Sequence, residues 1–213
     1  IIDLNKTVAM IEDAAAALKQ IARSGKKILF VATKKQAKLY VEEMAKSLNM
    51  PYITERWPGG LLTNFSTIRR SIKKMQSIDK MKENGTFDTL SKRERLQIDR
   101  QRAKLELNLG SIVKMTRMPE AIFIVDTNKE AIALSEANKL GIRSFAMNDT
   151  NTDPRKVSFP IPSNDDASKS IECVLNILSN SIREGLNDRA SEQDRRANEK
   201  KDMAKKIVEE KTQ

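Results

Sequence analysis

Two rows of apolar residues dominate the middle of the chain, between positions 61 and 118. Their side chains recur every three or four residues, which is the period of a helix with one buried face. The first row is Phe65, Ile68, Ile72, Met75, Ile78 and Met81, and the second is Ile98, Leu105, Leu109, Ile112 and Met115. Residues 84–87 between the rows include Gly85, which permits a reversal of the backbone. The pattern predicts a long antiparallel helical hairpin of coiled-coil type that ends before Pro119.

Short, continuously apolar runs lie on both sides of this hairpin. A run without polar positions is typical of a strand that is covered on both faces, as in a parallel sheet. The predicted strands are residues 28–32, 51–54, 121–125, 144–147 and 157–161. Pro160 limits the last of them to a sheet edge, because proline cannot donate a ladder hydrogen bond.

Amphipathic helices are predicted in the intervals around these strands. They cover residues 5–24, 33–48, 128–140 and 165–184. Thr33 and Gln36 have the spacing of a capping box at the start of the second helix, and Asn164 or Asp165 is expected to cap the last. Alternating strands and helices favour a doubly wound α/β domain, flavodoxin- or Rossmann-like, with a parallel five-stranded sheet.

The predicted organisation is one α/β domain interrupted by the hairpin. Residues 1–60 form its first part, residues 61–118 the coiled-coil insertion, and residues 119–186 its second part. Residues 187–213 are charged and almost devoid of aliphatic side chains, so we expect either a mobile tail or a solvated helix.

Positive charge is concentrated in the hairpin. The chain has 39 Lys and Arg against 29 Asp and Glu, a net charge of +10. Residues 65–118 hold fourteen cations and six acids, so +8 of that charge lies there. Cations that reach phosphates release condensed counterions, which makes nucleic acid the leading candidate partner. An anionic membrane surface is the rival, with the hairpin acting as a membrane or cytoskeletal adaptor.

Composition argues against several other classes. The chain has no histidine, so the usual general base and commonest metal ligand are missing. Its single Cys173 excludes an internal disulfide and fits a reducing compartment. No apolar run approaches the ~20 residues that span a bilayer. Together with the family resemblance described next, these features lead us to predict no catalytic residue, no metal site, no cofactor and no membrane partner.

Several motifs resemble those of a known family. Residues 30–37 read Phe-Val-Ala-Thr-Lys-Lys-Gln-Ala, and residues 55–65 read Glu-Arg-Trp-Pro-Gly-Gly-Leu-Leu-Thr-Asn-Phe. Further motifs follow in order: Glu-Ala-Asn at 136–138, Asp-Thr-Asn at 149–151 and Ile-Pro-Ser-Asn-Asp-Asp-Ala at 161–167. Together they are similar to the small-subunit ribosomal protein conventionally numbered two, of bacterial type, over residues 1–185.

Some positions depart from the family pattern. Ala32 and Ser163 stand where glycines are expected, Pro58 where leucine is expected, and Asn148 where an aliphatic residue is usual. None of these departures removes a charge. The family also has a preceding segment with a His-Phe-Gly-His element, and contacts made by that segment cannot be assigned to this chain.

The resemblance implies a structural role without catalysis. It implies binding to small-subunit ribosomal RNA between the head and body of the subunit, and help in docking the large messenger-binding ribosomal protein numbered one. It also implies the cytoplasmic ribosome of a bacterium in preference to an organellar one. The expected RNA-binding residues are Lys34, Lys35, Arg56, Asn64, Arg69, Arg70, Lys73, Lys74, Lys92, Arg93, Arg95 and Arg100.

Two residues at the hairpin junction are open to more than one interpretation. Trp57 could stack on a base, but we favour a structural plug that seals the hairpin onto the sheet. Arg56 could contact phosphate or form an ion pair with Glu55 or a neighbouring acid. Lys34 and Lys35 begin a helix after a strand, where a phosphate can bind, although the preceding loop lacks the glycines of a nucleotide site.

Three acids support an alternative of a different class. Asp126, Asp149 and Asp153 follow predicted strands, where doubly wound enzymes carry their chemistry. With Lys34 they could form a Mg²⁺-dependent phosphotransfer or nucleotide-binding site. We favour the simpler interpretation, in which Asp126 caps a helix and residues 149–154 form a loop of Asx turns.

Overall fold

The structure, a computed structural model, describes the backbone of residues 2–210 and the side chains of residues 2–196. At its centre lies a five-stranded, all-parallel sheet in the order β2-β1-β3-β4-β5. The strands are β1 (Ile28–Val31), β2 (Tyr52–Ile53), β3 (Ala121–Val125), β4 (Arg143–Asn148) and β5 (Phe159–Pro162). The predicted α/β fold with five parallel strands is confirmed. Pro160 lies in β5, at the sheet edge as predicted.

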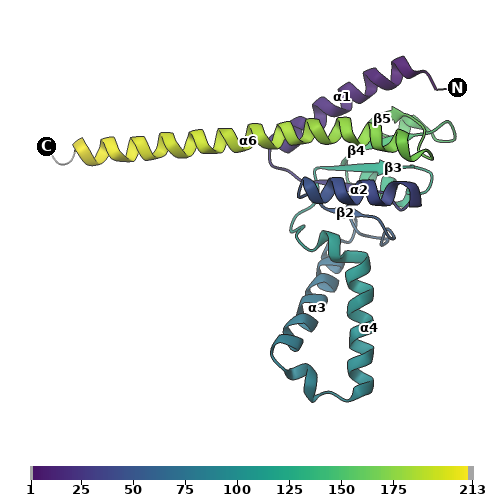
Figure 1. The fold of residues 1–213 in the computed structure, drawn as a ribbon, viewed down its shortest axis with the longest axis vertical. Coiled ribbons are helices and arrows are strands. Elements are labelled where there is room, and N and C mark those ends of the chain that lie inside the picture. Colours follow the sequence, from purple (N-terminus) through teal and green to yellow (C-terminus); the bar gives the residue numbers. More distant parts are fainter. Residues whose placement is uncertain (1, 211–213) are drawn as a thin grey trace.

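Helices cover both faces of the sheet (Figure 1). On one face lie α1 (Leu4–Arg23), α2 (Lys35–Ser47) and α6 (Ser168–Glu210). On the other lie α5 (Ala131–Lys139) and the base of the hairpin. Two apolar cores result, and the sheet separates them because side chains alternate between its faces. Phe30 and Phe123 pair across β1 and β3 and point into the first core, where both are fully buried.

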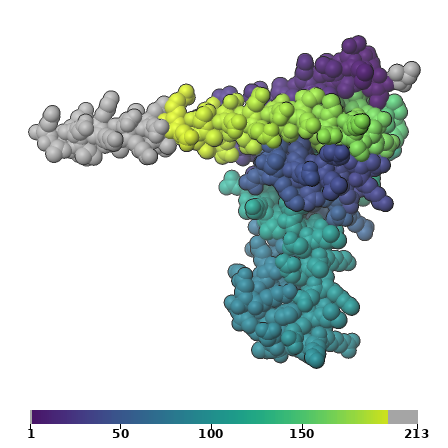
Figure 2. Space-filling view, viewed as in Figure 1, coloured from purple at the N-terminus to yellow at the C-terminus, as the bar shows by residue number. Residues whose placement is uncertain are grey.

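The hairpin projects away from the sheet domain (Figures 1 and 2). Its helices are α3 (Phe65–Glu83) and α4 (Lys92–Leu109), joined by a short 3-10 helix at Thr86–Thr89. Gly85 takes a positive φ of 72° at the reversal, a conformation that favours glycine. Ser91 and Glu94 form a capping box at the start of α4. A second 3-10 turn, Gly110–Ile112, returns the chain to the sheet.

The apolar seam of the hairpin is unequal along its length. In α3, Ile68, Ile72, Met75 and Ile78 are buried, whereas in α4 only Leu109 is. Ile98 and Leu105 are half-buried. Two helices and a reversal are therefore observed, while coiled-coil packing along the whole hairpin stays a prediction.

Two local predictions are wrong. Thr33 and Gln36 form no capping box, because Lys34 is the N-cap of α2 and has no side-chain cap bond. The Thr33 hydroxyl instead donates to Glu130, almost a hundred residues away. The last helix also does not end at residue 184, since α6 continues to Glu210.

The beginning of the charged tail lies against α1. Arg23 pairs with Glu192, and Lys19 Nζ lies 2.8 Å from a Glu184 carboxylate oxygen and 3.9 Å from one of Asp188. The tail is helical up to residue 210, which favours the helix over the mobile tail there. Side chains 197–210 and residues 211–213 lie outside the described residues. Within the described part, no helix is long and apolar enough to cross a membrane.

Candidate nucleic-acid interface

A single buried carboxylate fixes the base of the hairpin to the sheet domain. Glu136 of α5 is only 8% exposed. One of its oxygens accepts hydrogen bonds from the Trp57 ring nitrogen at 3.0 Å and the Gly60 amide at 2.7 Å. The other accepts from the Leu62 amide at 3.0 Å and from the Thr63 amide and hydroxyl, both at 3.1 Å. Five donors on residues 57–63 thus converge on one side chain immediately before α3 begins.

The hydrogen bonds keep this carboxylate ionised despite its burial. Burial alone would raise the pKa of Glu136, but the donors on Thr63, Trp57, Gly60 and Leu62 outweigh it and lower the pKa below the ordinary value of 4.5. The charged form is therefore the one the fold selects. Sequence reasoning missed this role of Glu136, since nothing near residue 136 indicates donors some seventy residues earlier in the chain.

Trp57 is the structural plug that we favoured. It is 8% exposed, belongs to the core on the hairpin side, and directs its only polar atom to Glu136. A base cannot stack on a ring that is already covered. Arg56 beside it is exposed, and Glu55 pairs with Lys38 at 3.0 Å, so the alternative of an Arg56–Glu55 ion pair is not observed.

The outer face of α3 is strongly basic. Arg70, Lys73, Lys74 and Lys80 are all exposed, and none forms an ion pair within the described part of the chain. Their positions lie roughly opposite the buried row at Ile68, Ile72 and Met75, because a helix turns 100° per residue. These four residues, here called the α3 cation face, lie on one side of the helix.

Few hairpin cations are neutralised by acids. Arg102 pairs with Asp79, Lys82 with Asp99 at 2.6 Å, and Arg95 with Asp88 at 3.7 Å. Glu94 is used in the helix cap and Glu106 lies 3.5 Å from Arg102. Ten of the fourteen cations have neither an ion pair nor a side-chain hydrogen bond in the described residues: Arg70, Lys73, Lys74, Lys80, Lys92, Arg93, Arg100, Lys104, Lys114 and Arg117. Neighbouring like charges repel each other on a helix, so an anion bound to this surface would stabilise it.

Two predicted RNA-binding residues also have structural contacts. The Arg69 guanidinium is part-buried and donates to the Val113 and Met115 carbonyls, each at 3.3 Å. It thereby joins α3 to the segment that leaves α4. Asn64 is exposed at the N-cap of α3, and its side-chain oxygen accepts from the Thr67 hydroxyl at 2.8 Å.

Lys34 and Lys35 differ sharply in their surroundings. Lys35 is exposed and unpaired among the described residues. Lys34 Nζ instead lies 2.7 Å from Asp165, 2.6 Å from Asp166 and 3.2 Å from Asp126. Burial opposes its charge, but the three hydrogen-bonded carboxylates raise the pKa of Lys34. Its charge is already neutralised, so the structure gives no support to a phosphate contact at Lys34.

The carboxylates around Lys34 outnumber its single positive charge. Burial and the nearby Asp126 and Asp149 raise the pKa of Asp165 in spite of Lys34. One Asp165 oxygen is buried without a hydrogen-bond partner. Asp149, Asp165 and Asp166 offer oxygens within 4.8 Å of one another, so these three residues have the spacing to hold a cation.

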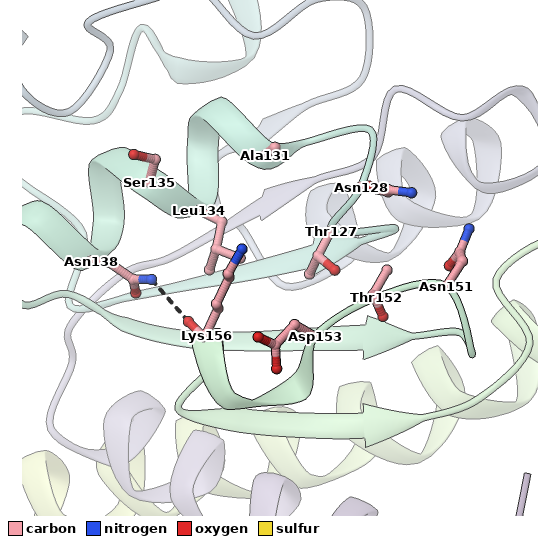
Figure 3. Close-up of a pocket in the computed structure, with 10 residues that line it drawn as sticks. All are labelled: Thr127, Asn128, Ala131, Leu134, Ser135, Asn138, Asn151, Thr152, Asp153 and Lys156. Atoms are coloured by element: carbon pink, nitrogen blue, oxygen red, sulfur yellow. Dashed lines mark hydrogen bonds between the residues drawn. The ribbon is translucent and has the colours of Figure 1, made fainter.

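The enzyme alternative comes together only in part, because Asp126, Asp149 and Lys34 gather around Asp165 while Asp153 lies apart. Asp126 accepts from the amides of Asn128 at 3.0 Å and Lys129 at 3.1 Å, and caps the turn that precedes α5. Asp153 lies elsewhere, in a pocket of about 500 Å³ between α5 and the loop after β4 (Figure 3). There it pairs with Arg155 at 3.0 Å. Neither Asp126, Asp149 nor Lys34 lines this pocket.

The fold and the charge distribution together define a class, an α/β protein with a basic helical arm that projects from the sheet domain. The sequence profile of the ribosomal protein S2 family matches residues 1–185. The chain belongs to this family, which is a structural component of the translation machinery and not an enzyme. The predicted resemblance is confirmed, and the phosphotransfer alternative is wrong.

Individual relatives agree with the family match. The chain is 64% identical over 194 residues to small ribosomal subunit protein uS2 of Flavobacterium johnsoniae. The aligned residues cover 91% of this chain and 76% of the relative. It is 62% identical over 192 residues to the uS2 protein of Phocaeicola vulgatus, covering 90% and 69%. For Porphyromonas gingivalis uS2 the identity is 61%, covering 90% and 68%. These relatives are bacterial, which confirms the predicted bacterial type and its cytoplasmic ribosome.

Proposed function

We propose that this chain is a structural constituent of the small ribosomal subunit that binds ribosomal RNA mainly through its basic hairpin. The observation that carries the proposal is the set of ten hairpin cations without an acidic partner in the described residues. In the proposed arrangement, residues 61–118 form a coiled-coil insertion, and the α/β domain is the platform that holds it. RNA helices present phosphates and sugars more readily than base edges, so these contacts carry little base preference.

The base of the hairpin supports this role mechanically. Glu136 and Trp57 tie residues 57–63 to α5, and Arg69 ties α3 to the segment after α4. An arm that is fixed at its base presents its cations in one orientation, which reduces the entropy lost on binding. By family resemblance, the site lies between the head and body of the subunit, and the protein helps to dock the large messenger-binding protein numbered one.

The refined set of RNA-binding residues differs from the sequence prediction. It retains Lys35, Arg56, Arg70, Lys73, Lys74 and Lys92, which are exposed, and adds Lys80 on the α3 cation face. Arg93 and Arg100 are also exposed, but they lie on α4 beside Leu96 and are assigned to a protein partner in the next subsection. Arg95 is paired with Asp88, Arg69 and Asn64 have local structural contacts, and Lys34 is held by carboxylates. These four are therefore expected to contribute less to binding.

Binding to purified small-subunit RNA across a salt series tests the proposal. In the variant, Arg70, Lys73, Lys74 and Lys80 are all changed to Gln, which leaves the structural Arg69 intact. Each phosphate contact contributes about 0.7–0.9 to the slope of log K against log salt, so the slope should fall in magnitude by about 3. We expect weaker binding at every salt concentration and an unchanged thermal unfolding transition of the sheet domain.

A matched control separates a specific surface from total charge. Lys6, Lys139, Lys156 and Lys169 are exposed, lie outside the hairpin and form no ion pair in the described chain. Changing these four to Gln removes the same net charge. The control should bind RNA with a slope close to that of the unaltered protein. Equal losses in both variants would contradict a hairpin-directed contact, as would no loss in either.

A further inference from the structure

The outer face of α4 differs in character from the α3 cation face. Leu96 and Leu107 are 53% and 65% exposed, which is unusual for large apolar side chains on a helix that is otherwise highly polar. With Arg100 and Ala103 between them, their spacings are four, three and four residues, so all four lie on one line of the helix. This line is on the side away from Ile98 and Leu105, which face the hairpin seam.

Cations flank the two leucines. Arg93, Arg100 and Lys104 are exposed and form no ion pair within the part of the chain that the structure describes. Spacings of seven and four residues place them beside the leucine line. Arg93, Leu96, Arg100, Ala103, Lys104 and Leu107 together are called the α4 strip below.

The apolar content of the strip distinguishes it from a phosphate-binding surface. A hydrated phosphate backbone gives a leucine side chain nothing to bury against. The α3 cation face contains no exposed large apolar residue and suits RNA better. Single exposed leucines are ordinary, but two on one line, with exposed cations between and beside them, combine the apolar and charged contacts of a protein interface.

We propose that the α4 strip docks an amphipathic, acidic protein segment. Its apolar side chains cover Leu96 and Leu107, and its carboxylates pair with Arg93, Arg100 and Lys104. The charge of the strip selects this occupant, because a basic or purely apolar segment would leave three cations unpaired. The inference deepens the proposed ribosomal function and rests on it: the hairpin would lie with RNA on the α3 side and protein on the α4 side.

Photo-crosslinking in assembled small subunits tests this division. Cys173 is the only cysteine and is exposed, so Cys173→Ser gives a background for single labels. Ala103→Cys places a benzophenone in the centre of the α4 strip, and Ser77→Cys places one beside the α3 cation face. Nuclease and protease digestion of the products distinguishes RNA from protein partners, and mass spectrometry identifies the attached peptide.

The two labels have separate expected outcomes. Ala103→Cys should yield a protein product whose crosslinked peptide has apolar residues and an excess of Asp and Glu. An RNA product, a basic peptide or no product at this position would overturn the proposal for α4. Ser77→Cys should yield an RNA product, and its failure would count against the proposed RNA contact without deciding what covers α4.

A double variant provides an independent readout. Leu96→Gln with Leu107→Gln changes two exposed side chains and keeps good helix formers, so folding should be unaffected. We expect unchanged affinity for naked small-subunit RNA, together with at least about tenfold faster loss of the protein from washed subunits, as for truncation of an interface centre. Loss of RNA affinity, or unaltered retention in subunits, would overturn the proposal.

Discussion

The anchor at Glu136 permits a quantitative test of how the hairpin is held. In Glu136→Gln, one carboxylate oxygen becomes an NH2 group. If the remaining oxygen keeps the three donors of Leu62 and Thr63, the NH2 group faces the Trp57 ring N–H and the Gly60 amide, both of which are also donors. The opposite orientation is worse, because three donors then lose their acceptor.

The expected cost follows from the two donors that lose an acceptor. An unsatisfied buried donor costs about 1–3 kcal/mol, so we expect a loss of about 2–6 kcal/mol in the free energy of unfolding. For a domain of this size, each kcal/mol corresponds to about 2–4 °C in the melting temperature. The transition should therefore fall by roughly 4–24 °C.

The assay uses the single tryptophan. Trp57 donates to Glu136, so its fluorescence during urea unfolding reports on the anchor itself. Glu43→Gln is the control, since Glu43 is exposed on α2 and forms no ion pair in the described residues. If Glu136→Gln matched this control within about 0.5 kcal/mol, a range usual for surface substitutions, the anchor would not carry the energy assigned to it.

Further expectations concern pH, the Lys34 cluster and the helix packing. Hydrogen bonds lower the pKa of Glu136 below 4.5. The contribution of its carboxylate to the free energy of unfolding is therefore complete above pH 4.5 and is lost as the pH falls through the lowered pKa of the folded state. The difference in stability between the unaltered protein and Glu136→Gln should shrink in acid. Lys34→Gln leaves the carboxylates of Asp126, Asp165 and Asp166 uncompensated and should destabilise the fold by about 3–5 kcal/mol at pH 7. The loss should be smaller near pH 5, because proton uptake by the carboxylates relieves their repulsion. An equal loss of stability at both pH values would contradict this. Gly185→Ala puts a Cβ 2.3 Å from the Lys19 carbonyl oxygen, where α6 crosses α1. Calorimetry should show a loss of about 1–3 kcal/mol in the free energy of unfolding. Gly59→Ala is the control and should have little effect, because the space around Gly59 is open.

The sheet could be predicted because its central strands have a purely local signal. Residues 28–31 and 121–125 are apolar at every position and fully buried, as strands covered on both faces require. The basic hairpin could be predicted for the same reason, since helical spacing and charge are local properties of the sequence. The start of β5 was predicted two residues too early, within the usual uncertainty of element ends.

Long-range contacts limited the prediction of the site. Lys34 looked like a phosphate ligand because the carboxylates that hold it lie about 90 and 130 residues further along the chain. Thr33 has the spacing of a helix cap, but its hydroxyl donates to Glu130 instead. The sequence around Glu136 does not indicate the donors at residues 57–63. In each case a charged or polar group is satisfied by a partner that only the folded sheet brings near.

A density map of the small subunit with this chain in place tests the central claim most directly. The quantity to measure is the distance from the side-chain nitrogens of Arg70, Lys73, Lys74 and Lys80 to the nearest phosphate oxygens. We predict that most of them lie within direct hydrogen-bonding reach, about 2.7–3.2 Å. An α3 cation face that meets only solvent, or the carboxylates of a neighbouring protein, would contradict the account.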